Sequence, residues 1–171
     1  MMAAKIKVLD DMFLDMLKDV YFAEKQILKT LPKMAKAANS AELKAAFEKH
    51  RDETEGQVDR IENVFEILGA PARGKTCDAI LGIIEEGKAV MEDFGDSPAL
   101  DAGLLATAQA VEHYEMARYG TLIAWAKQLG QQDAAKLLMQ TLEEEEKTDK
   151  DLTSLANSSV NASAAATSKA A

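Results

Sequence analysis

Acidic residues interrupt the apolar stripe of a segment whose spacing predicts a helix. In the stretch AVEHYEMARYGTL, residues 110–122, Val111 and Leu122 lie on the expected buried face. Glu115 lies on the same face and Glu112 borders it. Isolated ionised carboxylates in a protein core cost several kcal/mol each, even after the structure relaxes. The pattern therefore requires a chemical partner for these acids.

Three other helical segments show the same interruption near their midpoints. The residues concerned are Glu24 in the first segment, His50 with Glu53 at its edge in the second, and Glu145 with Asp149 in the last. Because the midpoints of antiparallel helices meet, we expect these side chains to converge. A metal ion, or a pair of them, would relieve the repulsion by direct coordination.

The donor types narrow the choice of metal. The di-iron and di-manganese bundles use Glu-x-x-His pairs, and this sequence contains none. It offers His50-x-x-Glu53 and Glu145-x-x-x-Asp149 instead, so the site would be almost entirely carboxylate. Such hard ligands favour iron, manganese, magnesium or calcium over copper or zinc. We expect two ions, iron or manganese, and leave the reaction, the small-molecule substrate and any enzymatic activity open.

A second interpretation stands beside the metal site. In an Ala-rich bundle the acids could lie on solvated flanks, and at most one or two residues of the run Glu143–Glu146 can face inward. His113 is expected to point away from the acidic stripe. The basic residues available for pairing are Lys25, Arg51, Arg118 and Lys147. The protein would then be a non-catalytic homodimeric scaffold or a partner-binding bundle without metal.

Helical spacing of apolar residues and turn signals predict the elements that position these side chains. Pro32 should kink or break the first helix, Ser40 and Ser97 are the expected N-caps, and Gly130 is the expected left-handed C-cap. The predicted helices cover residues 5–37, 41–68, 77–93, 98–129 and 131–157.

The lengths of the connections predict the topology. Short turns join the first two long helices and the last two, whereas about thirty residues with a short helix separate the hairpins. Two antiparallel hairpins with one long crossover indicate an all-α, ferritin-like four-helix bundle with an extra short helix. We assign residues 1–157 to this bundle and expect a disordered tail over 158–171, which is small and polar.

Composition excludes several classes of protein. Of the 171 residues 47% are hydrophobic and only 5% aromatic, which is typical of a helical bundle. The formal net charge of -9 argues against nucleic acid and anionic membrane surfaces as partners. One cysteine, Cys77, precludes an intramolecular disulfide and suits a reducing compartment. We find no signal peptide or membrane span and expect a cytoplasmic protein.

Several motifs resemble one known family. The segments YFAEKQILKTLPKMAKAANSAELKAAFEKH, GKTCDAI, VEHYEMARYGTLIAWAKQLG and TLEEEEKTD look like the ferritin-like bacterial stress proteins typified by YciE and YciF, over about residues 5–157. The resemblance implies a ferritin-like bundle, commonly a homodimer, with a dinuclear metal site and a role in general or osmotic stress.

The resemblance also implies a ligand set. Matched motif by motif, the ligands are Glu24, Glu53, Glu112, Glu115 and Glu145, together with His50 and Asp149. One departure concerns the segment ETEGQ, where family members often have a histidine at the position of Glu55 or Gln57. Its absence leaves His50 as the one plausible imidazole ligand and puts redox activity in doubt.

Overall fold

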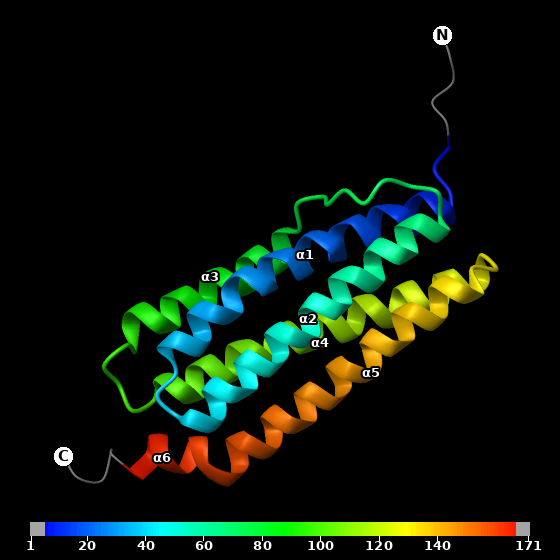
Figure 1. The fold of residues 1–171 in the computed structure, drawn as a ribbon. Coiled ribbons are helices and arrows are strands. Elements are labelled where there is room, and N and C mark those ends of the chain that lie inside the picture. The colour runs from blue at the N-terminus through cyan, green and yellow to red at the C-terminus, as the bar shows by residue number, and fades with distance from the viewer. Residues whose placement is uncertain (1–5, 167–171) are drawn as a thin grey trace.

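The computed structural model describes residues 6–166, and these residues form an all-helical fold, as predicted. Four long helices run alongside one another, and a shorter helix packs on their outside (Figure 1). The long helices are α1 (Leu9–Ala37), α2 (Ala41–Ile67), α4 (Leu100–Gln128) and α5 (Gln132–Leu155), and the shorter helix is α3 (Asp78–Asp93).

The helices pack as two hairpins. Helix α1 contacts α2, α4 contacts α5, and the hairpins meet through α2 with α5 and α1 with α4. Helix α3 lies against α4 and α1. The segment between α2 and α3 runs along α1, where the Lys75 N–H donates to the Lys18 carbonyl over 3.0 Å (Figure 1). This long crossover carries the chain from one hairpin to the other.

The turns that close the hairpins match two of the predicted caps. The Ser40 hydroxyl accepts from the Leu43 N–H at 3.2 Å, as an N-cap does. Asp101, from the first turn of α4, accepts from the backbone N–H of Ser40 at 2.7 Å and so ties this turn to α4. Gly130 has φ +74°, a left-handed conformation that glycine adopts without strain.

One local prediction, the N-cap at Ser97, differs from the structure, and of the two outcomes expected at Pro32 the break is not seen. Ser97 is not the N-cap of α4, because a separate turn precedes the helix and its N-cap is Ala99. The Ser97 hydroxyl accepts from the Ala99 N–H within that turn. Pro32 does not break α1, which continues to Ala37 with Pro32 itself exposed. Buried side chains on both sides of Pro32, Leu31 and Met34, hold the helix on the core.

A polar layer divides the core into two apolar clusters. On α4, Val111 belongs to the first cluster and Tyr119 to the second, with Glu112 and Glu115 between them. The first apolar cluster includes Ile27, Leu31, Phe47, Ile84, Leu104 and Leu152, and the second includes Phe13, Leu17, Val20, Ile61, Leu122 and Leu138. The polar layer comprises the buried residues Glu24, His50, Thr54, Gln57, Glu112, Glu115, Thr141 and Glu145.

Two glycines let α3 approach α4 closely. A Cβ atom on Gly87 would lie 2.8 Å from the Thr107 Cγ2 atom. A Cβ on Gly103 would lie 2.6 Å from Cγ1 of Val90. Both distances are too short for real carbon contacts, so glycine at these positions permits the close packing that covers the first apolar cluster.

Helical structure extends beyond α5. A π-helical turn, Ala156–Val160, leads into α6 (Asn161–Ala166), and Val160 is buried against the first apolar cluster. This differs from the disordered tail expected from residue 158, because one apolar side chain in a polar stretch finds a place on the core. Residues 167–171 of that expected tail lie outside the described residues.

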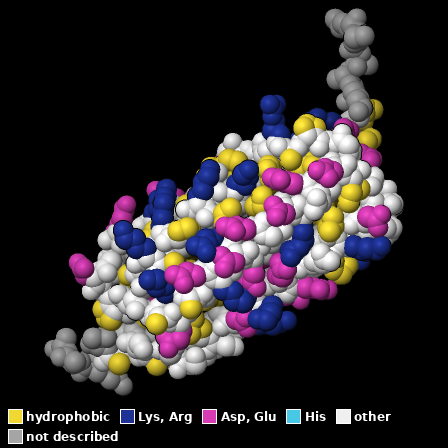
Figure 2. All heavy atoms as spheres, in the orientation of Figure 1, with side chains coloured by type: hydrophobic (Ala, Val, Ile, Leu, Met, Phe, Trp, Pro, Cys, Tyr) yellow, Lys and Arg dark blue, Asp and Glu magenta, His cyan; other side chains and the backbone are white. Residues whose placement is uncertain are grey.

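The exterior is strongly charged. On the face drawn in Figure 2, basic and acidic side chains are interspersed, and neither sign forms one continuous field. Among the described residues, no helix combines the length and apolar character needed to cross a membrane.

Candidate metal centre

Four side chains of the polar layer converge on one point. His50 from α2, Glu112 and Glu115 from α4, and Glu145 from α5 each offer one atom, and these atoms lie within 4.8 Å of one another. All four residues are buried: the three glutamates have no exposed surface and His50 is 3% exposed. We call these four residues the central cluster.

Helix geometry explains the convergence. Glu112 and Glu115 are three residues apart on α4, so they share one face of that helix. Helix α5 packs on α4 and also on α2, which brings Glu145 and His50 to the same level. The Nδ1 atom of His50 lies 3.2 Å from Glu112 Oε1, and its Nε2 atom lies 3.9 Å from Glu145 Oε2.

Glu24 adds a fourth buried carboxyl, from α1. The Tyr119 hydroxyl donates a hydrogen bond to its Oε1 atom. Burial raises the pKa of Tyr119 well above its ordinary value, so the hydroxyl keeps the proton that it donates. Burial and then the charge of Glu145 raise the pKa of Glu24 to about 8. Tyr119 therefore orients one oxygen of Glu24 and leaves the other free.

The acids of the central cluster strongly favour their protonated forms. Burial and then interaction with Glu145 raise the pKa of Glu112 to about 11. Burial and then the charges of Glu145 and Glu24 raise the pKa of Glu115 well above its ordinary value. Burial also raises the pKa of Glu145, to about 7. Without a cation Glu112 and Glu115 hold protons at neutral pH, because like charges in a dry interior repel, whereas Glu145 is only partly protonated there.

His50 cannot supply the missing positive charge. Burial and then the charge of Lys49 lower its pKa to about 4, so the imidazole is neutral near pH 7. A neutral imidazole has a lone pair on one ring nitrogen and is in the form that binds metals. Its Nε2 atom has no hydrogen-bond partner in the structure.

The buried polar atoms of the layer that lack hydrogen-bond partners indicate whether these residues suit a metal ion. Buried polar atoms normally have hydrogen-bond partners. Here the buried atoms of the layer without one are both carboxylate oxygens of Glu112 and of Glu115, Oε2 of Glu24, Oε2 of Glu145, Oε1 of Gln57 and Nε2 of His50. These are oxygen donors with one imidazole nitrogen, a set that suits hard or borderline divalent cations. The residues present therefore fit a metal centre.

Two supporting residues, Gln57 and Arg60, were not identified as such from the sequence. The Gln57 amide donates to Glu145 Oε1 at 2.5 Å, and Arg60 pairs with Glu144, also at 2.5 Å. The positive charge of Arg60 lowers the pKa of both Glu24 and Glu145, which partly offsets burial. With Tyr119, these side chains surround the acids. Only the packing of α2 on α5 reveals this, because neither residue interrupts an apolar stripe in a recognisable way.

The structure also resolves which neighbouring positions face inward. Of the run Glu143–Glu146, Glu145 is buried and Glu144 turns to Arg60, whereas the first and last residues are exposed. Of the two positions at which the resemblance led us to look for a histidine, Gln57 is 1% exposed and faces the cluster, whereas Glu55 is exposed. An amide therefore occupies the place from which a second imidazole would reach the acids.

Besides Glu24, which is buried beside it, two residues of the expected ligand set lie outside the central cluster. Glu53 pairs with Lys49 at 2.5 Å, and its side chain is 25% exposed. Asp149 lies 3.3 Å from His113 Nε2 and accepts from Gln109 at 3.2 Å, with its side chain 21% exposed. His113 itself is largely exposed and points away from the cluster, as expected. On their helices, Glu53 and Asp149 therefore lie beside the face that points into the core and not on it.

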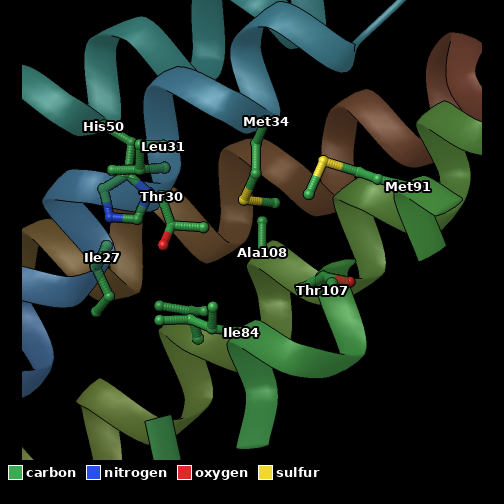
Figure 3. A pocket seen from close by; sticks show the side chains of 11 residues that line it. Ile27, Thr30, Leu31, Met34, His50, Ile84, Met91, Thr107 and Ala108 are labelled. Carbon is green, nitrogen blue, oxygen red and sulfur yellow. The ribbon is translucent and has the colours of Figure 1, made fainter. Parts of the chain in front are cut away.

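Two hollows reach His50 from different sides. The apolar pocket lies among α1, α3 and α4, and Figure 3 shows His50 on its wall with Ile27, Leu31 and Ile84. The polar cleft, with a volume of about 60 Å³, lies between α2 and α5. Its lining residues are Ala46, Phe47, Lys49, His50, Glu53, Thr148, Asp151 and Leu152. The central cluster thus borders an apolar pocket on one side and a cleft lined by charged side chains on another.

Comparisons with known proteins agree with the resemblance seen in the sequence. A family model described as a domain of unknown function (DUF892) matches residues 8–165. Protein YciF of Escherichia coli (strain K12) is 46% identical over 157 residues, which cover 91% of this chain and 95% of that protein.

Solved structures show the same fold. The crystal structure of the E. coli stress protein YciF matches with a TM-score of 0.87 and 46% identity, covering 91% of this chain and 99% of that chain. YcfI of Rhodopseudomonas palustris, described as a structural protein, matches with a TM-score of 0.85 and 42% identity, covering 90% and 98%. The chain therefore belongs to the DUF892 family, and it is similar to the E. coli stress protein YciF over nearly its whole length.

Proposed function

We propose that this protein is a ferritin-like four-helix bundle that binds two iron or manganese ions and serves in stress protection. The observation that carries the proposal is the set of buried, unpartnered carboxylate oxygens from α1, α4 and α5 beside a neutral imidazole. Glu24, Glu112, Glu115, Glu145 and His50 are the residues that would hold the ions. The stress role rests on the name of the E. coli relative.

The number of donors supports two ions rather than one. Four buried carboxyls and one imidazole exceed the protein ligands that one ion needs when it also keeps a position for solvent or substrate. Bridging carboxylates would hold two such ions close together. When bound, iron or manganese supplies Lewis-acid and one-electron chemistry. Such a centre could store metal, handle peroxide or oxidise a small substrate. We propose that the protein does so as a homodimer in the cytoplasm.

The polar cleft supports a route for the ions. Lys49 and Glu53 stand on its wall, and Glu53 Oε2 is buried without a hydrogen-bond partner. His50 lines the inner part of the same cleft. We assign Glu53 to the approach of cations toward His50, and not to the final ligand set.

The decisive experiment is elemental analysis. Metal-free protein is reloaded with ferrous iron or manganese under anaerobic conditions and then desalted. About two ions retained per chain is the expected result. Retention of none would overturn the proposal.

The second candidate function is a scaffold without metal, which the description of the R. palustris relative as a structural protein favours. Thermal unfolding with and without a chelator separates the two functions. A metal that binds only the native state raises stability by mass action. A scaffold with protonated acids would unfold at the same temperature in both conditions.

A further inference from the structure

The apolar pocket borders the central cluster, because His50 belongs to the cluster and also lines the pocket. Its lining includes Ile27, Leu31, Ile84, Ala108 and Val111, with His50 on the wall toward the acids (Figure 3). Both ring nitrogens of His50 lie near carboxylates, at 3.2 Å from Glu112 and 3.9 Å from Glu145. The nitrogen atoms of the imidazole therefore lie on the side of the acids, and Nε2 has no hydrogen-bond partner there.

The surface of the pocket is almost entirely apolar, although His50 and two threonines contribute to its lining. The Thr30 hydroxyl donates to the Gln26 carbonyl at 2.9 Å, and the Thr107 hydroxyl donates to the Gly103 carbonyl at 3.0 Å. The two threonines have therefore already committed their hydroxyl protons to their own helices. A buried water needs two to four polar partners, and cavities without them stay dry. The pocket therefore disfavours water and ions.

The size of the pocket limits its occupant. Its cavity volume is about 20 Å³, somewhat more than the ~10–15 Å³ that one water-sized molecule requires. A molecule of two heavy atoms suits this space, whereas an organic substrate of many atoms would have to displace the lining. The occupant must also be uncharged and apolar.

We propose that the apolar pocket binds dioxygen, held against His50 at the edge of the central cluster. Dioxygen is small, uncharged and apolar, and the pocket would concentrate it one imidazole away from the carboxylates. Its relevance to a metal centre rests on the proposed function. Binding of the gas itself depends only on the cavity and its lining.

Paramagnetic relaxation by dissolved oxygen tests the proposal in the full-length, metal-free protein. Under oxygen pressure, NMR measures the added relaxation rate of methyl groups. We expect the methyls of Leu31 and Ile84 to relax several-fold faster than those of Leu122 and Leu138. These controls are buried in the second apolar cluster and do not line the pocket. Equal enhancement in the two groups would overturn the proposal.

A matched pair of variants gives a second test. Ala108→Val fills the pocket, whereas Ala135→Val adds the same atoms at an equally buried site in the second apolar cluster. Ala108→Val should reduce the enhancement at Ile84 to the level of Leu138, and Ala135→Val should leave it unchanged. Persistence of the full enhancement in Ala108→Val would contradict the assignment.

An enlarging variant keeps the test available if Ala108→Val does not fold. Val111→Ala widens the pocket and should increase the enhancement at Ile84; no increase would contradict the assignment. All of these readouts use metal-free protein, so they are independent of ion retention. Failure of the metal proposal appears in elemental analysis alone, and failure of the oxygen proposal appears in relaxation alone.

Discussion

The polar layer and the two apolar clusters are built from the same helices but have opposite energetic roles. Burying a large apolar side chain such as Leu138 stabilises the fold by about 1.5–3 kcal/mol. Burying Glu115, whose two oxygens have no hydrogen-bond partner, destabilises the fold. A carboxyl group in an apolar interior loses its hydrogen bonds with water, whether it is protonated or ionised. The clusters on either side therefore hold the layer in place.

This contrast identifies the polar layer as the part of the core that lowers the stability of the fold. A layer of apolar residues at the same positions would join the two clusters into one core and stabilise it further. Acids persist across three helices instead, and sites that break local rules in this way are usually functional. The following predictions sharpen the contrast between layer and clusters.

The largest effect concerns ion retention. The double change Glu24→Ala and Glu115→Ala removes two buried carboxyls and should abolish retention of ferrous iron or manganese. Glu146→Ala, on the exposed side of α5, is the matched control and should retain as much as the native protein. Elemental analysis of desalted protein measures this. Unchanged metal content in the double variant would refute the ligand assignment.

A change within an apolar cluster should affect stability alone. Leu138→Ala creates a cavity in the second cluster and should lower the free energy of unfolding by about 2–5 kcal/mol. Denaturant unfolding measures the loss, which should be the same at pH 6 and pH 9, since no titratable group of the layer lies in that cluster. The Leu138→Ala variant should retain as many ions per folded chain as the native protein.

The metal-free protein should lose stability as pH rises. Glu24 and Glu145 have folded pKa values of about 8 and about 7, above an unfolded value of 4.5. Between these limits the native state holds protons that the unfolded chain has lost, so stability falls with pH. For Glu145 alone the loss is on the order of 3 kcal/mol between pH 5 and pH 8.

His50 produces the opposite slope at low pH. Its folded pKa of about 4 lies below the ordinary 6.5, so the unfolded chain binds a proton first as pH falls. One histidine is outweighed by the several acids whose folded pKa values are raised, so His50 flattens the curve near pH 4–5, and stability should fall from there to pH 9. Unfolding of metal-free protein over pH 4–9 measures the curve. A curve that rises from pH 6 to pH 9 would show that the acids are not buried in protonated form.

A smaller effect is expected in the polar cleft. Glu53→Gln should slow the loading of ferrous iron several-fold while leaving the final number of ions per chain unchanged. Stopped-flow measurement of loading separates rate from amount. Glu48→Gln, an exposed change on the same helix, is the control. A fall in the final number of ions would return Glu53 to the ligand set.

The smallest effect is expected at Asp149. This side chain pairs with His113 and Gln109 outside the central cluster. Asp149→Asn should change ion affinity less than twofold, as measured by competition with a chelator. A loss of tenfold or more would extend the metal centre beyond the buried cluster.

The sequence alone indicated the helices and the level at which their acids meet. Periodic apolar residues from Leu9 to Leu155 place the long helices within a few residues of their ends, because burial of one face dominates helix formation in proteins. Acids on that face, such as Glu24 and Glu115, mark their own positions by interrupting the stripe. Local capping is less predictable, and Ser97 fails because a turn competes for its hydroxyl.

Only the tertiary structure decided which donors face each other. Glu53 lies close to the stripe in sequence and yet turns to Lys49, whereas Gln57, with no metal-binding signal, reaches Glu145. The rotation of each helix about its axis depends on packing by its neighbours, and a few tens of degrees move a side chain from the interior to the surface. Sequence determined that acids lie midway along the helices; packing chose Glu112, Glu115 and Glu145 with His50, and left a dry pocket beside them.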